Sequence, residues 1–279
     1  MNENQRLAGK AAIVTGAGRG IGQQIALRLA ADGGRVLVND LDREACEETA
    51  NKIVAMGGEA LAIAADLTSD AAPDQIVDAC IQGFGAIDIV VNNAGYVWNS
   101  AMHKHSDEQW QAMLDMHATA PFRLLRACYP VFKDQAEREA ASGAQVQCRK
   151  VVNISSVSGT EGAATQVAYS AGKAAVVGLT KTLAKEWGRL NITVNCVAFG
   201  PISTRLTQTY DGPPPTIEVA GRDFKVGLSQ AQVDAMVPTI PLRRVGAPED
   251  AAGAVYLFCI PESDFVTGQL LICSGGLRG

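Results

Sequence analysis

A serine, a tyrosine and a lysine follow one another in the stretch NISSVSGTEGAATQVAYSAGK, residues 153–173. Tyr169 and Lys173 are four residues apart, so on a helix they share a face. A phenol titrates near pH ~10, and a nearby ammonium lowers that pKa by favouring the phenolate. Tyr169 can then donate a proton to a carbonyl or remove one from an alcohol. The hydroxyl of Ser156 can hydrogen-bond to the same substrate oxygen.

The same residues also have ordinary structural explanations. Tyrosine and lysine at this spacing are common on helix surfaces and interfaces, and Ser156 alone would be a strand-end cap. The catalytic interpretation therefore needs a cofactor site in the same domain.

A glycine-rich turn near the start of the chain predicts that cofactor site. The stretch TGAGRGIG (15–22) follows an apolar run and opens an amphipathic segment. Gly16, Gly20 and Gly22 remove side chains where the backbone must approach a diphosphate. The helix that follows offers free N–H groups and a positive dipole to the anion. A tight turn without a ligand is the alternative, but the position after the first strand favours a dinucleotide.

Asp40 ends the second apolar run, eighteen residues after Gly22. A carboxylate there accepts hydrogen bonds from the ribose hydroxyls and repels a 2′-phosphate, which favours NAD over NADP. Arg19 points the other way, because a guanidinium beside the turn can hold that phosphate. Since Asp40 occupies the deciding position and Leu41 follows it, we expect NAD. A solvated strand end and a surface charge are the alternatives for Asp40 and Arg19.

The elements that must position these residues alternate along the chain. Short runs rich in Val, Ile, Leu and Ala predict strands that are buried on both faces, as in a parallel sheet covered by helices. Longer amphipathic segments separate them, which indicates a single-domain, doubly wound α/β fold of the Rossmann type over residues 1–279. The expected strands are 11–14, 35–39, 60–64, 87–92, 150–154, 192–197 and 269–273.

Two segments depart from this alternation. Residues 133–148 are mostly polar and predict an extended helix with a surface loop. Residues 207–237 contain DGPPP, which cannot continue a helix. A long insertion of this kind is more often functional than structural, so we expect a substrate lid at 207–237. Disorder is the alternative for both segments.

Composition excludes several classes of protein. The net charge of −5 and the absence of a basic block argue against nucleic-acid partners. Seven cysteines without metal-type spacing indicate reduced thiols in a cytoplasmic protein and no metal site. The first ten residues lack the apolar region of a signal peptide, and no apolar run approaches the ~18 residues of a membrane span.

Together the motifs resemble the short-chain dehydrogenase/reductase family. TGAGRGIG, NNAG (92–95) and YSAGK (169–173) occur in the family's order, with a serine thirteen positions before the tyrosine. NCVAFGPIST (195–204) and TGQLLICSGG (267–276) extend the resemblance, which covers residues 7–276. It is closest to the 3-oxoacyl reductase and 3-hydroxyacyl dehydrogenase branch.

The resemblance implies a set of cofactor contacts. Lys173 is expected to hold the nicotinamide ribose, Asp66 the adenine, and residues 200–204 the nicotinamide. Asn92 has an alternative as a structural hydrogen bond between strands. The full expected set is Gly16, Arg19, Gly20, Ile21, Gly22, Asp40, Asp66, Leu67, Asn92, Ala94, Gly95, Tyr169, Lys173, Gly200, Ile202 and Thr204.

The sequence departs from the family pattern at two positions. His117 stands where the family usually has an asparagine that holds a water in a proton relay to the lysine. A neutral imidazole can also donate or accept, so we hypothesise that His117 takes over the relay as a catalytic residue, with a charge that changes near neutral pH. A helical histidine with no catalytic part is the alternative. Pro121 is expected to bend that helix if it lies inside it, and Phe199 replaces a usual proline and can contact cofactor or substrate.

The expected function is hydride transfer between NAD(H) and a secondary alcohol or ketone, such as a 3-oxoacyl or 3-hydroxyacyl thioester. Steroid, sugar and simple alcohol dehydrogenases share the motifs, and an epimerase, a dehydratase or a non-catalytic NAD sensor are further alternatives. Substrate choice is expected to depend on 96–105, 157–167 and 207–237, with an apolar pocket from Tyr96, Trp98, Phe199 and Met236. The resemblance implies a homotetramer.

Overall fold

A seven-stranded parallel sheet forms the centre of the computed structural model, which describes residues 5–205, 207–219 and 221–277. Its strand order is β11-β6-β5-β4-β1-β2-β3, so the chain reverses direction across the sheet between β1 and β4. The strands of this sheet are β1 (Ala11–Thr15), β2 (Arg35–Asp40), β3 (Glu59–Ala64), β4 (Ile89–Asn92), β5 (Arg149–Ser156), β6 (Ile192–Phe199) and β11 (Leu270–Cys273).

The predicted fold class is confirmed, because every residue of β1, β4 and β6 is buried, as continuous apolar runs require. Register is set by paired parallel ladders, such as Val14 beside both Val38 and Val91. The seven predicted strands all form, with ends that differ by two residues or fewer.

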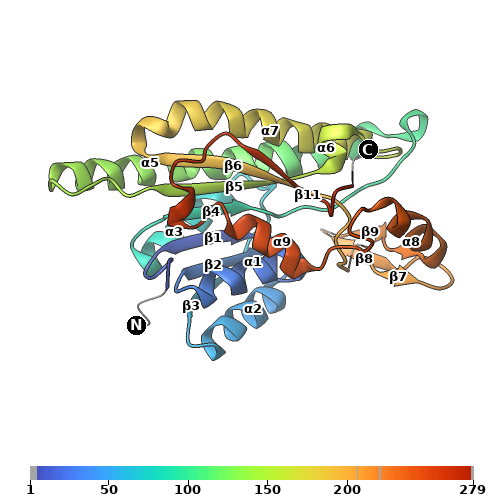
Figure 1. Cartoon of the computed structure of the whole chain (residues 1–279), viewed down its shortest axis with the longest axis horizontal. Helices are drawn as coiled ribbons and strands as arrows, with labels where there is room; N and C mark the ends of the chain where they lie inside the picture. Colours follow the sequence, from blue (N-terminus) through green and yellow to red (C-terminus); the bar gives the residue numbers. More distant parts are fainter. Residues whose placement is uncertain (1–4, 206, 220, 278–279) are drawn as a thin grey trace.

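Helices cover both faces of the sheet (Figure 1). On one face the apolar sides of α1, α2 and α9 pack into a single core cluster, and on the other face α3, α5 and α7 form a second cluster. The longer helices are α1 (Gly20–Ala31), α2 (Arg43–Ala55), α3 (Ala72–Phe84), α4 (Asp107–Leu114), α5 (Ala120–Ala141), α7 (Val167–Trp187) and α9 (Pro248–Tyr256).

Shorter elements complete the described chain. They are η1 (Met102–Lys104), η2 (Asp115–Thr119), α6 (Val157–Glu161), η3 (Gly188–Leu190), α8 (Gln230–Met236), η4 (Val237–Thr239) and η5 (Pro261–Ser263). Of these, η2 is a π-helical segment between α4 and α5. Pro121 lies in the first turn of α5, directly after it, and has no N–H to donate to the carbonyl of residue 117 in the α-helical pattern. The sequence predicted a bend at Pro121, and the structure has a widened, π-helical turn directly before it.

The insertion at 207–237 is folded over most of its described length. It contains β7 (Thr209–Tyr210), β8 (Thr216–Val219), β9 (Arg222–Lys225) and β10 (Leu228–Ser229), followed by α8. Strands β8 and β9 form an antiparallel hairpin, and β7 pairs with β10. In Figure 1 this group lies beyond one end of the sheet. Its position next to the strand ends places it beside the candidate site.

The polar segment at 133–148 also matches its prediction in part. Helix α5 extends to Ala141, and a loop follows before β5 begins at Arg149. Glu139 of this helix holds the buried guanidinium of Arg149 at 2.6 Å, which ties the helix end to the sheet. Among the described residues, no helix combines the length and apolar character that crossing a bilayer requires.

Candidate active site

A cavity of about 1110 Å³ opens at the carboxyl ends of the central strands. Residues that follow β1, β2, β3, β4, β5 and β6 line it, and so do η2, α7 and the hairpin β8–β9. Ligands of open α/β sheets bind at this edge, where the strand order reverses. The cavity joins the glycine turn to Ser156, Tyr169 and Lys173, as the catalytic interpretation requires.

The glycine turn lines one end of the cavity, at the start of α1. Gly16 and Gly20 have positive φ angles of 60° and 56°, a conformation that glycine adopts without strain. A Cβ added at Gly20 would have no atom closer than 3.8 Å, so the backbone there is open toward the cavity. The free N–H groups of the first helical turn fit an anion such as a diphosphate.

Gly16 and Gly22 are needed for a different reason from the one predicted. A Cβ at Gly22 would lie 2.0 Å from the carbonyl oxygen of Gly16 and 2.5 Å from Nδ2 of Asn93. A Cβ at Gly16 would lie 2.7 Å from Cα of Ala94. These two glycines therefore allow the turn to pack against the segment after β4.

Asp40 lies at the end of β2 and faces the glycine turn. Its Oδ2 accepts a hydrogen bond from the amide of Gly18 at 3.0 Å, and its Oδ1 accepts one from the amide of Asp42 at 3.3 Å. Arg19 is bound instead by the carboxylate of Asp42, at 2.7 Å. The guanidinium that could have held a 2′-phosphate is thus already paired with an anion.

Asp66 and Leu67 line the cavity after β3, where an adenine is expected. The Oδ1 atom of Asp66 accepts hydrogen bonds from the amide and hydroxyl of Thr68, at 2.9 and 2.7 Å, which fixes this loop. Sequence reasoning missed Asn39. Its buried Nδ2 donates to the carbonyls of Ile63 and Ala65, both at 3.2 Å, and so ties the end of β2 to the loop.

Asn92 does not line the cavity, and it makes the structural hydrogen bond between strands that was its alternative interpretation. Its side chain is buried and donates to Oδ1 of Asn153 at 2.8 Å, which links β4 to β5. The next residue, Asn93, lines the cavity together with Ala94 and Gly95. The Nδ2 of Asn93 donates to the carbonyls of Thr15 and Gly16, so it also holds the glycine turn.

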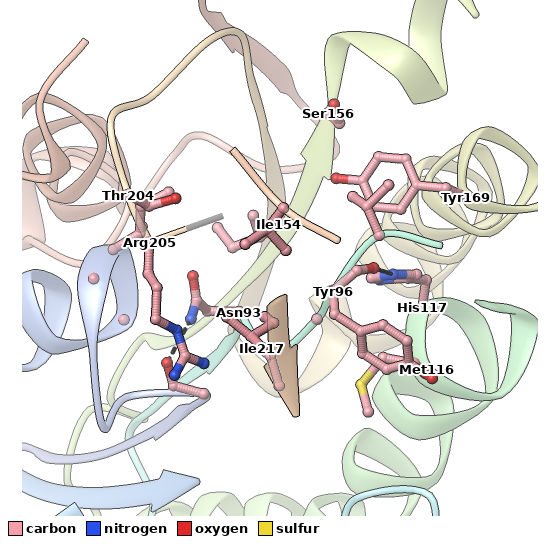
Figure 2. Close-up of a pocket in the computed structure, with 18 of the residues that line it drawn as sticks. Asn93, Tyr96, Met116, His117, Ile154, Ser156, Tyr169, Thr204, Arg205 and Ile217 are labelled. Carbon is pink, nitrogen blue, oxygen red and sulfur yellow. Dashed lines mark hydrogen bonds between the residues drawn. The ribbon is translucent and has the colours of Figure 1, made fainter. Parts of the chain in front are cut away.

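Ser156 and Tyr169 lie side by side where β5 ends and α7 begins. Figure 2 shows their hydroxyls facing into the same part of the cavity. Ser156 caps α6 by accepting from the amide of Ser158 at 3.1 Å, so its proton is free to be donated elsewhere. The structure brings the predicted serine and tyrosine together.

The pKa of Tyr169 does not follow the sequence prediction. Burial raises the pKa of this phenol, and a hydrogen bond with Ser156 opposes the rise. Lys173 does not provide the expected lowering, because its Nζ donates to the carbonyl of Ile154 at 2.8 Å and lies 5.8 Å from the centre of the Tyr169 ring. Ser156 is therefore the neighbour that favours the phenolate in this state.

Lys173 is itself strongly affected by its surroundings. Its side chain is 5% exposed, and burial lowers the pKa of its ammonium to about 8. A lysine with such a pKa can change charge in a mildly alkaline solution. It lines the same cavity as Tyr169, and its expected contact with the nicotinamide ribose stays a prediction.

His117 lies in the π-helical segment η2 and is 1% exposed. Its ring meets that of Tyr169 edge to face, with centres 4.9 Å apart, and its Nε2 lies 2.7 Å from the carbonyl oxygen of Tyr96. Burial and the neighbouring Lys173 hold the pKa of His117 well below its ordinary value. The predicted change of charge near neutral pH is therefore wrong, since this imidazole stays neutral there. Its part in a proton relay stays a prediction.

The loop after β6 forms the remaining wall. Phe199, Gly200, Ile202 and Thr204 all line the cavity, and the expected contacts with the nicotinamide stay a prediction. Sequence reasoning missed Thr207. Its Oγ1 accepts from the amide of Thr204 at 2.9 Å and donates to the carbonyl of Ile202 at 2.5 Å. A threonine three residues after another, in the loop that follows Gly200, was the available signal.

The predicted apolar pocket is only partly correct. Tyr96 and Phe199 line the cavity, whereas Trp98 and Met236 do not. Trp98 packs against Phe224 of the hairpin, with ring centres 5.1 Å apart. The hairpin residues that line the cavity are Ile217, Glu218, Gly221 and Lys225, followed by Val226, Gly227 and Leu228. The sequence indicated that this segment borders the site, but not which of its residues line the cavity. The hairpin packs against Tyr96 and Trp98, which are more than one hundred positions away in the chain.

Known proteins resemble this chain in sequence and in fold. The sequence profile of the short chain dehydrogenases matches residues 10–213. A 3-oxoacyl-[acyl-carrier-protein] reductase from Synechocystis sp. is 35% identical over 273 residues, which are 97% of this chain and 98% of that protein. The (2S)-[(R)-hydroxy(phenyl)methyl]succinyl-CoA dehydrogenase subunit BbsD of Thauera aromatica is 35% identical over 96% of both chains.

A solved structure has the same architecture. The short-chain type dehydrogenase/reductase from Mycobacterium marinum superposes with a TM-score of 0.81 at 29% sequence identity. The match covers 99% of this chain and 98% of that one. The insertion at 207–237 is thus included in a fold of the same overall length.

Proposed function

The chain belongs to the short-chain dehydrogenase family, and on that premise we propose that it is an NAD(H)-dependent oxidoreductase of 3-oxoacyl and 3-hydroxyacyl thioesters. Membership makes it an enzyme that uses a nicotinamide cofactor on a CH–OH or ketone group. One observation supports the proposal most strongly: a single cavity contains the glycine turn, Asp40, and the hydroxyls of Ser156 and Tyr169.

The residues of the site fit a dinucleotide. The open backbone at Gly20 and the N-terminus of α1 suit its diphosphate, and Asp66 and Leu67 suit its adenine. The bound cofactor would supply or accept the hydride. Lys173 would bind its ribose, and Gly200, Ile202 and Thr204 would lie along the nicotinamide.

The remaining chemistry belongs to two hydroxyl groups of the chain. In the reductive direction Tyr169 donates the proton that the new alcohol requires, since its raised pKa keeps it protonated at neutral pH. Ser156 donates a hydrogen bond to the substrate oxygen and stabilises the charge that develops there. In the oxidative direction the same phenol must first lose its proton, and the hydrogen bond with Ser156 favours that loss.

The choice of NAD is supported by the charges around the adenosine end. Asp40 places a carboxylate where a 2′-phosphate would lie, and Arg19 is bound to Asp42 at 2.7 Å. Both features disfavour a phosphate at that position.

The thioester class is supported by two of the relatives. The names of the Synechocystis and Thauera proteins describe an acyl-carrier-protein substrate and a CoA substrate, which are both acyl thioesters. The hairpin β8–β9 is proposed as the lid over the acyl portion, because Ile217 and Val226 line the cavity. Assembly as a homotetramer is proposed from the family resemblance.

The test is turnover of a simple 3-oxoacyl thioester, acetoacetyl-CoA, with NADH and with NADPH. We expect NADH to be oxidised, with a kcat/KM at least about tenfold above that for NADPH. A panel of steroid, sugar and simple ketones, assayed beside it, covers the alternative substrates. Turnover of another ketone but not of the thioester would overturn the substrate class, and binding of NADH without any turnover would support the sensor.

A further inference from the structure

His117 is held as one tautomer by the backbone of the loop after β4. Its Nε2 lies 2.7 Å from the carbonyl oxygen of Tyr96, and a carbonyl only accepts, so Nε2 carries the proton. Nδ1 is then unprotonated, and it is buried without a hydrogen-bond partner among the described residues. The ring is therefore a neutral donor with one fixed bond, which Figure 2 shows as a dashed line.

Two glycines leave the space that this ring occupies. A Cβ at Gly95 would lie 2.4 Å from Cε1 of His117, and a Cβ at Gly172 would lie 2.8 Å from its Cβ. Gly95 belongs to the loop after β4, and Gly172 directly precedes Lys173 in α7. The imidazole thus fills a gap between the loop after β4 and helix α7.

Tyr96, whose carbonyl accepts the bond from His117, also contacts the hairpin β8–β9 through its ring. The ring of Tyr96 lies 5.0 Å from that of Phe224, which is 4% exposed. Ile217, Phe224 and Val226 form a small apolar cluster against which Tyr96 and Trp98 pack. On the opposite side His117 meets the Tyr169 ring at 4.9 Å and 90°. A continuous series of contacts therefore runs from Phe224 through Tyr96 and His117 to Tyr169.

We propose that His117 is a positioning residue that couples the seating of hairpin β8–β9 to the orientation of Tyr169. The hairpin fixes Tyr96, the Tyr96 carbonyl fixes the imidazole through Nε2, and the imidazole fixes the phenol from its edge. The inference rests on the proposed function, in which Tyr169 is the acid and base. A histidine that only fills space would contribute to stability but would not link the hairpin to the rate.

A double-mutant cycle on kcat tests the coupling. Phe224→Ala removes the hairpin contact, and His117→Leu removes the donor while keeping a side chain of similar size. We expect Phe224→Ala to lower kcat about tenfold in the wild-type background and less than about twofold in His117→Leu, because interacting residues are not additive. Thr216→Ala, on the same hairpin but exposed and outside the cavity lining, is the matched control and should have the same effect in both backgrounds. Equal effects of Phe224→Ala in both backgrounds would overturn the proposal.

The conservative variant separates position from packing. In His117→Gln the amide nitrogen can reach the place of Nε2 and donate to the Tyr96 carbonyl. We expect this variant to keep the kcat and the Phe224 coupling of the wild type, whereas His117→Leu loses both. A His117→Gln variant as impaired as His117→Leu would contradict a role for the Nε2–H donor.

A measurement without substrate distinguishes failure of this inference from failure of the proposed function. Protein labelled with 5-fluorotryptophan has three fluorine resonances, one for each tryptophan, and Trp98→Phe assigns that of Trp98. We expect His117→Leu to shift the Trp98 resonance, His117→Gln to leave it in place, and the buried Trp187 to stay unchanged in both as a control for folding. An unmoved Trp98 resonance in His117→Leu would overturn the coupling whether or not the protein turns over a thioester.

Discussion

At the scale of single residues, the site works through side chains whose charges are set by their neighbours. Burial keeps Tyr169 protonated and lowers the pKa of Lys173 to about 8, and burial together with Lys173 keeps His117 uncharged. Asp40 and Asp42 are anions that face the glycine turn and its Arg19.

Cofactor preference should follow the two carboxylates. In the variant Asp40→Ala with Asp42→Ala, the repulsion of a 2′-phosphate is removed and Arg19 is freed to bind it. We expect the affinity for NADPH to rise at least about tenfold, while that for NADH falls. Cofactor fluorescence measures both dissociation constants. A variant that binds NADPH no better than the wild type would show that Asp40 and Asp42 do not decide the choice.

The rate of ketone reduction should fall in alkaline solution. Lys173 is charged below its pKa of about 8 and loses its proton above it, whereas Tyr169 stays protonated across this range. Since kcat/KM reports the free enzyme, we expect it to be level from pH ~6 to ~7.5 and to fall about tenfold per pH unit above ~8. A profile that stays level up to pH ~9.5 would contradict the role proposed for Lys173, in which its charged amine binds the ribose.

At the scale of elements, the ends of strands and the starts of helices place the residues. The turn between β1 and α1 packs so closely on the segment after β4 that only glycine fits at two positions. The π-helical segment η2 turns His117 toward Tyr96 and Tyr169. The hairpin β8–β9 adds an apolar cover from outside the sheet.

The glycine turn offers a prediction with a matched control. Gly22→Ala would place a Cβ 2.0 Å from a backbone oxygen, so we expect it to abolish NADH binding and to destabilise the fold. Gly253→Ala, in α9, meets no atom within 4 Å and should stabilise the protein by about 0.5–1 kcal/mol through helix propensity. Urea unfolding and NADH titration check both variants. A Gly22→Ala protein that binds NADH normally would contradict the close packing.

The sequence predicted most of these elements because buried parallel strands leave an unmistakable pattern. Val14, Val38 and Val91 belong to apolar runs that are visible without any structure. The site was predictable where a motif fixes local geometry, as at Ser156 and Tyr169. It was not predictable where long-range contacts decide: Asn92 and Asn93 differ only in which way each points, and the bond from His117 to Tyr96 spans twenty-one positions.

At the scale of the whole molecule, one sheet edge brings together segments that are far apart in the chain. The cavity takes residues from the first glycine turn at 16–22 to the hairpin beyond residue 216. Large apolar side chains remain exposed on the outer surface. Among them are Trp110 of α4 and Phe122 of α5, which are 40% and 46% exposed and belong to the continuous helical stretch formed by α4, η2 and α5.

This exposed pair leads to a prediction about assembly. If the α4–α5 stretch is an interface of the proposed homotetramer, Phe122→Glu should place a charge in it and reduce the particle mass from four times 29.3 kDa to half that value. Light scattering coupled to size-exclusion chromatography measures the mass. Lys133→Glu on the solvent-facing part of α5 serves as the control. A tetramer that persists in Phe122→Glu would place the interface elsewhere.

The central claim is that Tyr169 exchanges the proton that accompanies hydride transfer. Its most direct test compares the wild type with Tyr169→Phe, which keeps the ring against His117 and removes only the hydroxyl. NADH binding and NADH oxidation with a 3-oxoacyl thioester are measured on the same samples. The account predicts that NADH still binds while kcat falls by about 10²–10⁴, and equal turnover by the two proteins would contradict it.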